Sequence, residues 1–314
     1  MRATNDILSD IRRQPERDDL RLEYADACQA KDPDHARYIR TELEFWRPGS
    51  SVETPRGNAR VATRIAHAFE KYCYSVELNR GFVEEVTMDP YIFIDHGDKL
   101  LDLAPIRMIT FTPKPIPPGL DRPSTRQVVP SAVPEVMACP HIARVYGIDF
   151  DNSNFQTWYL EESDIEAVLA SKYLGRLLTF ALPDGRTQDS WRDDYCADVW
   201  ERAFDRPEFR KMLRVNFPHY PGEHSREYDD DWERVTEPIP MGAQGRALEQ
   251  KHGYLPSLHV INRWGTEPTS LPFNHDLVLG VLRGELPKFP VGAPVTEEMY
   301  ALPPPKRRTT GNNW

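Results

Sequence analysis

Four apolar triplets with the same internal spacing constrain this chain more than any other feature. The segments VEEVTM (83–88), IRMITF (106–111), VYGIDF (145–150) and LLTFAL (177–182) each place apolar residues at the first, fourth and sixth positions. In a strand the fourth and sixth residues share a face, so each segment has one face suited to burial. The copies recur along the chain, which predicts a row of similar strands stacked in a common register.

Matches outside the triplets strengthen this interpretation. The last three copies carry an apolar residue three positions upstream, at Leu103, Ile142 and Leu174. In two of them an arginine comes immediately before the triplet, in HIARV (141–145) and YLGRL (173–177). The pattern is typical of leucine-rich-repeat strands, whose apolar residues enter a solenoid interior while the intervening positions line a concave sheet.

Helices are predicted between the strands. SDIEAVLA (163–170) has a buried face, and its Ser163 and Glu166 match a capping box. A short helix is expected near 135–138 and a longer one over 190–213, broken near Pro207. Further strands are predicted at MLRVNF (212–217) and, more weakly, at LPSLHV (255–260).

Residues 5–46 read as two or three short helices, punctuated by Pro15 and Pro33. Residues 47–58 are rich in turn formers and predict a linker, and a stripe of apolar residues predicts a helix over 61–74.

Two stretches resemble the bacterial repeat-companion domain, a helical module that precedes leucine-rich or similar repeats. Residues 7–44 carry its P-x-x-D-x-x-R-L-x-Y-A-D core, which begins at Pro15. LNRGFVEEVTMD (78–89) and LLDLAPIRMITFT (100–112) are similar to the strands that open its repeat array. Ala27 and Cys28 depart from the W-L pair usual after Y-A-D. The resemblance implies a recognition scaffold without catalytic activity.

The fold expected is α/β, a short irregular leucine-rich-repeat-like solenoid with a helical N-terminal cap and a divergent C-terminal extension. The predicted parts are a cap (1–46), a linker and helix (47–80), repeats (81–186) with a proline-rich insertion (112–134), the extension (187–302) and a disordered tail (303–314).

Composition excludes several classes of function. The formal charge of −10 argues against a sequence-independent grip on nucleic acid. Since the chain has neither a signal-peptide core nor a long apolar run, we expect no membrane partner and a cytoplasmic protein. The four cysteines lack metal-site spacing and are expected to be reduced and mostly buried.

Candidate catalytic and metal-binding residues are few. The acidic cluster of Asp18, Asp19, Glu23 and Asp26 lies among arginines, which predicts a salt-bridged surface. Because no nucleophile motif or phosphate loop is present, the sequence predicts no enzyme, no cofactor and no metal site. An alternative places an enzyme or metal site in 186–300, using His219, His224 or His259.

The function expected is recognition of another protein, as an adaptor or regulatory scaffold in a bacterial cell. A second alternative is a partner or protease substrate of a bacterial defence or signalling system. The predicted partner contacts are exposed positions of the strands and two tryptophans in polar surroundings: Glu84, Arg107, Thr110, Tyr146, Asp149, Trp158, Thr179 and Trp232.

Overall fold

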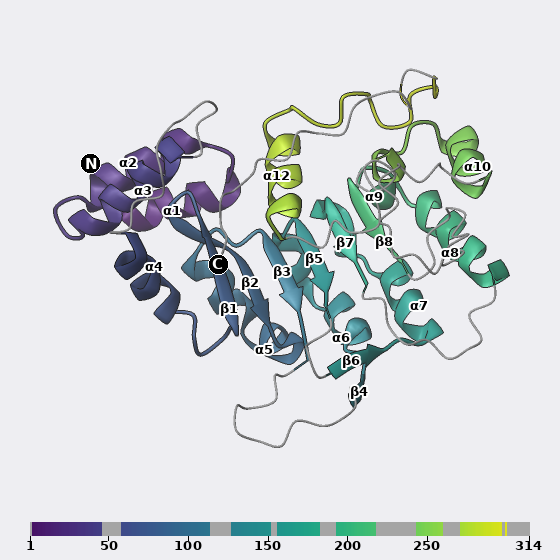
Figure 1. Cartoon of the computed structure of the whole chain (residues 1–314), viewed down its shortest axis with the longest axis horizontal. Helices are drawn as coiled ribbons and strands as arrows, with labels where there is room; N and C mark the ends of the chain where they lie inside the picture. Colours follow the sequence, from purple (N-terminus) through teal and green to yellow (C-terminus); the bar gives the residue numbers. More distant parts are fainter. Residues whose placement is uncertain are drawn as a thin grey trace, which may run out of the picture. The chain divides into compact units, whose positions relative to one another are not determined.

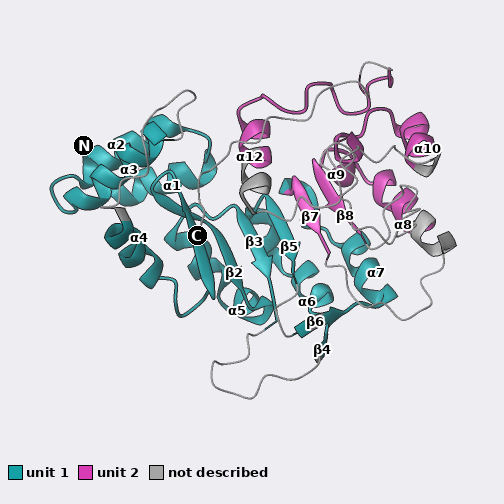
Figure 2. Cartoon of the chain, viewed as in Figure 1, with its two compact units in different colours: residues 1–176 teal, residues 177–314 magenta. Residues whose placement is uncertain are grey.

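The computed structural model describes residues 2–45, 58–113, 127–151, 156–182, 193–217, 243–259, 271–296 and 299. The chain divides into two compact units, unit 1 at residues 1–176 and unit 2 at residues 177–314 (Figure 2). Both are mixed α/β, and their strands pair mostly in parallel. This confirms the α/β class expected from the triplets.

Three helices form the predicted N-terminal cap: α1 (Thr4–Arg13), α2 (Asp18–Cys28) and α3 (Pro33–Phe45). Their buried faces share one apolar cluster, in which Ile7 and Ile39 meet Phe82. The next helix, α4 (Asn58–His67), stops before Tyr74, so the prediction of a helix to that residue is wrong. Residues 68–72 form turns instead, because the chain must reverse into a strand that begins at Ser75.

The sheet of unit 1 contains β1 (Ser75–Asn79), β2 (Phe82–Met88), β3 (Met108–Phe111) and β5 (Gly147–Phe150), in that order (Figure 1). β1 is antiparallel to β2, whereas β2, β3 and β5 are parallel.

The triplets pair in the predicted register. Their fourth residues stand side by side as Val86, Ile109 and Ile148, and their sixth as Met88, Phe111 and Phe150.

Helices and short turns separate the parallel strands. α5 (Pro90–Leu103) lies between β2 and β3, and Asp89 caps it by accepting from the Tyr91 amide. α6 (Val133–Met137) and the 3-10 helix η1 (Pro140–Arg144) precede β5, while α7 (Glu162–Ala170) and η2 (Leu174–Arg176) end unit 1. Two further strands, β4 (Gln127–Pro130) and β6 (Gln156–Tyr159), form a separate parallel pair.

Aromatic side chains at the sixth triplet position hold the core of unit 1. The ring centroids of Phe111 and Phe150 are 5.1 Å apart, and Phe93 of α5 lies 5.3 Å from Phe111. All three are buried. The stack joins two strands to the helix that connects β2 with β3, a geometry in which each aromatic pair adds about 1 kcal/mol beyond burial.

Unit 2 contains the parallel strands β7 (Thr179–Ala181) and β8 (Arg214–Asn216). β8 confirms the strand predicted at 212–217. The helix predicted over 190–213 is α8 (Asp193–Asp205) followed by α9 (Pro207–Arg210), with the break where proline was expected to cause it. Helices α10 (Ala243–His252) and α12 (Leu271–Leu282) follow.

Several local predictions differ from the structure. β1 lies in a segment assigned to a linker and helix, and the weak strand predicted at 255–260 is wrong because residues 256–259 are helical, with Pro256 setting the first turn. The capping box of α7 uses Glu161 and Asp164 rather than Ser163 and Glu166. The tail at 303–314 and most of the proline-rich insertion lie outside the described residues.

The turn between β1 and β2 gives a test of how the cap docks. Gly81 has a φ of +89°, and a Cβ there would lie 2.4 Å from Ile39 Cγ1 and 2.9 Å from Ile39 Cα of helix α3. Gly81→Ala should lower the free energy of unfolding by about 3 kcal/mol, through backbone strain and overpacking. Gly175→Ala is the control, because its Cβ would meet nothing within 4 Å. Equal denaturant midpoints for the two variants would contradict this packing.

Candidate binding site

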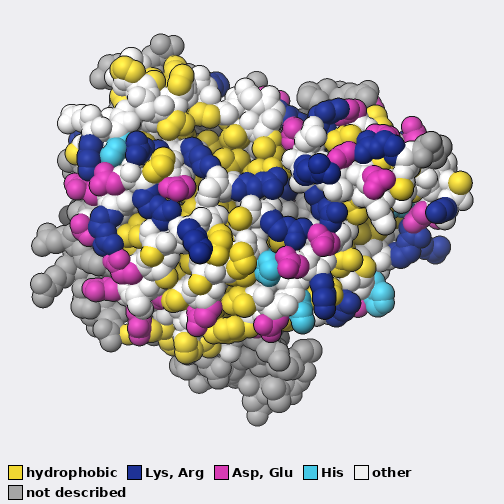
Figure 3. Space-filling model, turned by 180° about the vertical axis from the view of Figure 1, so that it is seen from behind, with side chains coloured by type: hydrophobic (Ala, Val, Ile, Leu, Met, Phe, Trp, Pro, Cys, Tyr) yellow, Lys and Arg dark blue, Asp and Glu magenta, His cyan; other side chains and the backbone are white. Residues whose placement is uncertain are grey.

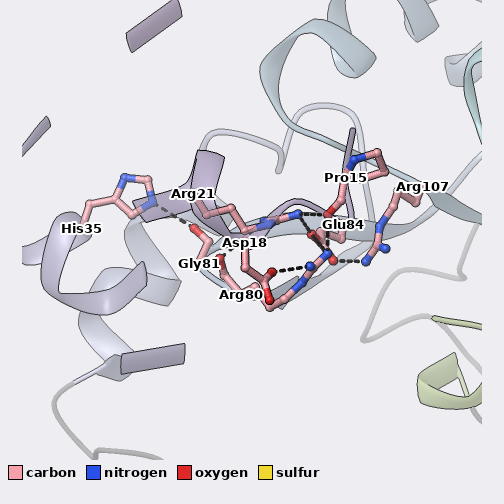
Figure 4. A network of polar contacts seen from close by, with 8 residues as sticks. All are labelled: Pro15, Asp18, Arg21, His35, Arg80, Gly81, Glu84 and Arg107. Atoms are coloured by element: carbon pink, nitrogen blue, oxygen red, sulfur yellow. Dashed lines mark hydrogen bonds and ion pairs between the residues drawn. The ribbon is translucent and has the colours of Figure 1, made fainter. Parts of the chain in front are cut away.

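A buried ionic network links the cap to the sheet (Figure 4). Arg21 of α2, Arg80 of the β1–β2 turn and Arg107 before β3 all pair with the carboxylate of Glu84 on β2. These four side chains are 0–1% exposed. One carboxylate therefore connects three chain segments that are far apart in the sequence.

Backbone and peripheral groups complete the network. The carbonyl oxygen of Pro15 accepts from Arg80 at 2.7 Å and from Arg21 at 3.0 Å, and Asp18 pairs with Arg80 at 2.7 Å. Burial, followed by the positive charge of Arg80, lowers the pKa of Arg21 to about 9. Burial lowers the pKa of Arg107 to about 10. Both guanidiniums remain charged at neutral pH, so removing Glu84 would leave like charges buried together.

A histidine makes a second connection between the cap and the sheet. His35 of α3 lies 2.9 Å, through Nε2, from the carbonyl oxygen of Gly81, and its ring packs edge-on against Tyr24 and Phe82. Burial lowers the pKa of His35 below its ordinary value of 6.5. The neutral imidazole is thus the form that the folded protein prefers.

The predicted exposure of the strand positions is wrong for most of them. Glu84 and Arg107 neutralise one another inside the network just described. Thr110 is buried because it stands on an inner strand between Thr87 and Asp149. Asp149 is half-buried.

The predicted exposure is also wrong for Tyr146, Thr179 and Trp158, because all three are buried. Tyr146 lies beneath an arginine, and Thr179 stands beside Arg214 of β8. The Trp158 indole donates to the Asp151 carbonyl oxygen at 2.9 Å. Trp232 lies outside the described residues, and the partner-binding role of all eight positions stays a prediction.

Four arginines instead line a cleft at the surface of unit 1. Arg12 and Arg13 come from α1, Arg144 from η1 and Arg176 from η2. The cleft has a volume of about 240 Å³. Its carboxylate, Asp102, accepts from Arg144 at 2.7 Å and from Arg12 at 3.1 Å.

The floor of the cleft is apolar. It consists of the buried residue Leu101 in the last turn of α5 and of Ala104, Pro105 and Ile106, which join α5 to β3. Basic and apolar side chains also lie next to one another in several places on the face drawn in Figure 3. Guanidinium groups above an apolar floor are suited to a ligand that carries both negative charge and hydrocarbon.

Arg176 is held differently from the other arginines of the cleft. Its Cζ lies 4.2 Å from the ring centroid of Tyr146, and Nη2 donates to the Tyr146 hydroxyl. Among the residues that the structure describes, Arg176 forms no ion pair, whereas Arg12, Arg13 and Arg144 all do. A stacked guanidinium has little rotamer freedom left to lose when it binds an anion.

The sequence contained one signal for this cleft. Arg144 and Arg176 are the two arginines that precede their triplets at the same position, and η1 and η2, which carry them, lie in contact. The repeat therefore brings them to one edge. Nothing in the sequence pointed to Arg12 or Arg13, because only the docking of α1 brings them there.

Three of the four carboxylates of the acidic cluster on α2 form a salt-bridged surface, as predicted, whereas Asp18 pairs with the buried Arg80. Asp19 pairs with Arg17, Glu23 with Arg2 and Asp26 with Arg40. Cys28, Cys73 and Cys139 are buried free thiols.

The histidines proposed for an alternative site in 186–300 fall in two places. His219 and His224 lie outside the described residues. His259 is buried in unit 2, with Nε2 2.6 Å from Glu249 Oε1 and its ring against Tyr254. Ser257 is buried nearby in sequence, but its hydroxyl has no hydrogen-bond partner within the described part of the chain, so it is not paired to His259 as a nucleophile would be. Among those residues, no group of three or more potential ligands could hold a metal ion.

No family model, no curated protein and no solved structure matches this chain. Over the ranges that the structure describes, each helix is too short or too polar to cross a bilayer.

The ionic network predicts a large effect of a small substitution. Glu84→Gln keeps the shape of the side chain but leaves three guanidiniums without their buried counter-charge, so it should lower the free energy of unfolding by about 3–5 kcal/mol. Asp19→Asn removes a carboxylate from the exposed pair with Arg17 and should change it by less than about 1 kcal/mol. Chemical denaturation of both variants measures the difference. Comparable losses would show that Glu84 does not hold the network together.

The buried imidazole predicts a dependence of stability on pH. Since folding lowers the pKa of His35 below 6.5, the unfolded chain takes up the proton first as pH falls. The free energy of unfolding should therefore decrease between about pH 7.5 and about pH 5.5, and His35→Gln should decrease less steeply across that range. His67→Gln, which removes an exposed imidazole that contacts Glu70, is the control. Identical slopes for all three proteins would contradict the role of His35.

Proposed function

We propose that this protein is a non-catalytic recognition scaffold, built from irregular leucine-rich-repeat-like units behind a helical cap, that binds another protein. The observation that carries the proposal is the cleft formed by Arg12, Arg13, Arg144 and Arg176 over an apolar floor. Arginine, tyrosine and apolar surface together are the composition of binding hot spots. An adaptor or regulatory role inside a bacterial cell is part of this proposal.

In this proposal the partner binds at the arginine cleft, and not on the face of the sheet that the sequence predicted. Positions such as Arg107 and Thr110 are buried, so they support recognition only indirectly, by fixing the strands. Two of the four arginines of the cleft, Arg144 and Arg176, come from turns that precede strands, where sequence can vary without disturbing the core. This arrangement suits a scaffold whose specificity changes while its fold persists.

The ionic network supports the same reading. A docked cap with buried charges holds α1 in one orientation, and α1 supplies Arg12 and Arg13 to the cleft. Preorganised arginines lose less conformational entropy when a partner binds.

Quantitative affinity purification from cells of the source organism tests the proposal. The full-length native chain should enrich a partner that Arg12→Glu/Arg144→Glu loses at least about tenfold, because reversal replaces attraction with repulsion. Arg37→Glu is the matched control: Arg37 is an exposed arginine of α3 that lies outside the cleft lining. A partner retained equally by the double variant, or none enriched above the tag alone, would contradict a protein-binding role for the cleft.

A further inference from the structure

The chemistry of the cleft narrows the class of partner. We propose that it binds an acidic peptide segment of a partner protein, in which carboxylates pair with Arg144 and Arg176 while an adjacent apolar side chain packs on the floor. This inference rests on the proposed function, and it names the ligand of the same site.

Charge gives the first step. Four guanidiniums and the carboxylate of Asp102 line the cleft, which amounts to a formal charge of +3 before the outer partners are counted. Asp98 and Asp10 pair with Arg144 and Arg13 from outside the lining and reduce this to +1. The cleft is thus locally basic in a chain whose net charge is −10.

The small basic cleft in an acidic protein disfavours the binding of long polyanions. A nucleic acid would run far beyond the cleft and meet the negative charge of the whole molecule, and it would gain nothing from an apolar floor. A short acidic segment places its charge only where the arginines are. The volume of about 240 Å³ accommodates one or two side chains rather than a folded surface.

Arg176 supplies the second step. Its guanidinium stacks on Tyr146 and is the one arginine of the cleft without a carboxylate partner among the described residues. A planar fork held in place can accept a carboxylate with two parallel hydrogen bonds, which a lysine cannot reproduce. Arg176 should therefore contribute more to binding than Arg144, whose charge is already shared with Asp98 and Asp102.

The floor supplies the third step. Ala104, Pro105 and Ile106 form a bend of buried, apolar chain between α5 and β3; Ala104 is 3% exposed and Ile106 5%. Inorganic phosphate or a free carboxylate would leave this surface wet. An apolar side chain next to the acidic one would displace that water and add about 25 cal/mol for each Å² covered.

Fluorescence anisotropy with the full-length protein tests the proposal. The probe is a labelled seven-residue peptide that alternates leucine with aspartate or glutamate, compared with a leucine–lysine peptide and a serine–aspartate peptide. The native protein should bind the acidic apolar probe at least about tenfold more tightly than either comparison peptide, with an affinity that falls as salt rises.

Variants identify the site. Arg176→Ala should weaken the acidic probe at least about tenfold, and Arg176→Lys should restore only part of the loss because it keeps the charge without the fork. Arg37→Ala should bind as the native protein does. Thermal melting confirms that each variant is folded. If Arg176→Ala does not fold, Arg176→Lys alone tests the role of the guanidinium.

Each other result overturns the inference. Equal binding of the lysine peptide would show that the cleft does not prefer negative charge. Equal binding of the serine peptide would show that the apolar floor does not contribute to binding. Unchanged binding by Arg176→Ala would place the site elsewhere. Displacement of the probe by equimolar inorganic phosphate would identify a small-anion site instead. If a cellular partner is captured but the probe does not bind, the preference for an acidic peptide is wrong and the proposed recognition of a protein stands. If the probe binds but no partner is captured, the preference for an acidic peptide stands and the proposed recognition of a cellular protein is contradicted.

Discussion

The carboxylate of Glu84 is the interaction on which the arrangement of unit 1 depends. It is the common partner of Arg21, Arg80 and Arg107, which belong to the cap, the hairpin turn and the start of β3. Buried ion pairs add little net stability compared with apolar packing, but an incomplete one is severely destabilising. The network therefore acts by excluding alternatives: a cap docked in another orientation would separate Arg21 from Glu84, and Arg80 from Asp18 and the Pro15 carbonyl.

The docking of the cap also positions α1, which supplies two arginines to the cleft. The helix packs into the apolar cluster of the cap through Ile7 and Ile11, and Arg12, the next residue along the chain, donates to Asp102 of α5. Rigid placement of the cap is thus also rigid placement of half of the cleft. The other half comes from the turns before the strands, whose positions follow from the register of the triplets. The cleft therefore combines arginines positioned by the docking of the cap with arginines positioned by the pairing of the strands.

Periodicity made much of the fold predictable. The four triplets identified β2, β3, β5 and β7, and MLRVNF identified β8. The pairing of Val86 with Ile109, and of Ile109 with Ile148, is the one that the spacing required. β1 escaped because its sequence, SVELN, alternates polar and apolar residues over only five positions and does not have the spacing of the triplets. The site was less predictable. The alternation rule assigned Glu84, Arg107 and Tyr146 to an exposed face, but a strand pattern says nothing about a cap or an arginine that covers that face.

β1 also has a consequence for how such a sheet meets its surroundings. It runs antiparallel to β2 and occupies the edge that would otherwise be open to another parallel strand. A free edge is a template for pairing with other chains, and short, charge-bearing edge strands are one way in which proteins prevent it. β1 is five residues long and carries Glu77 in its centre. A further parallel strand could not pair with β2 on this side, because β1 already occupies the hydrogen-bonding groups of that edge.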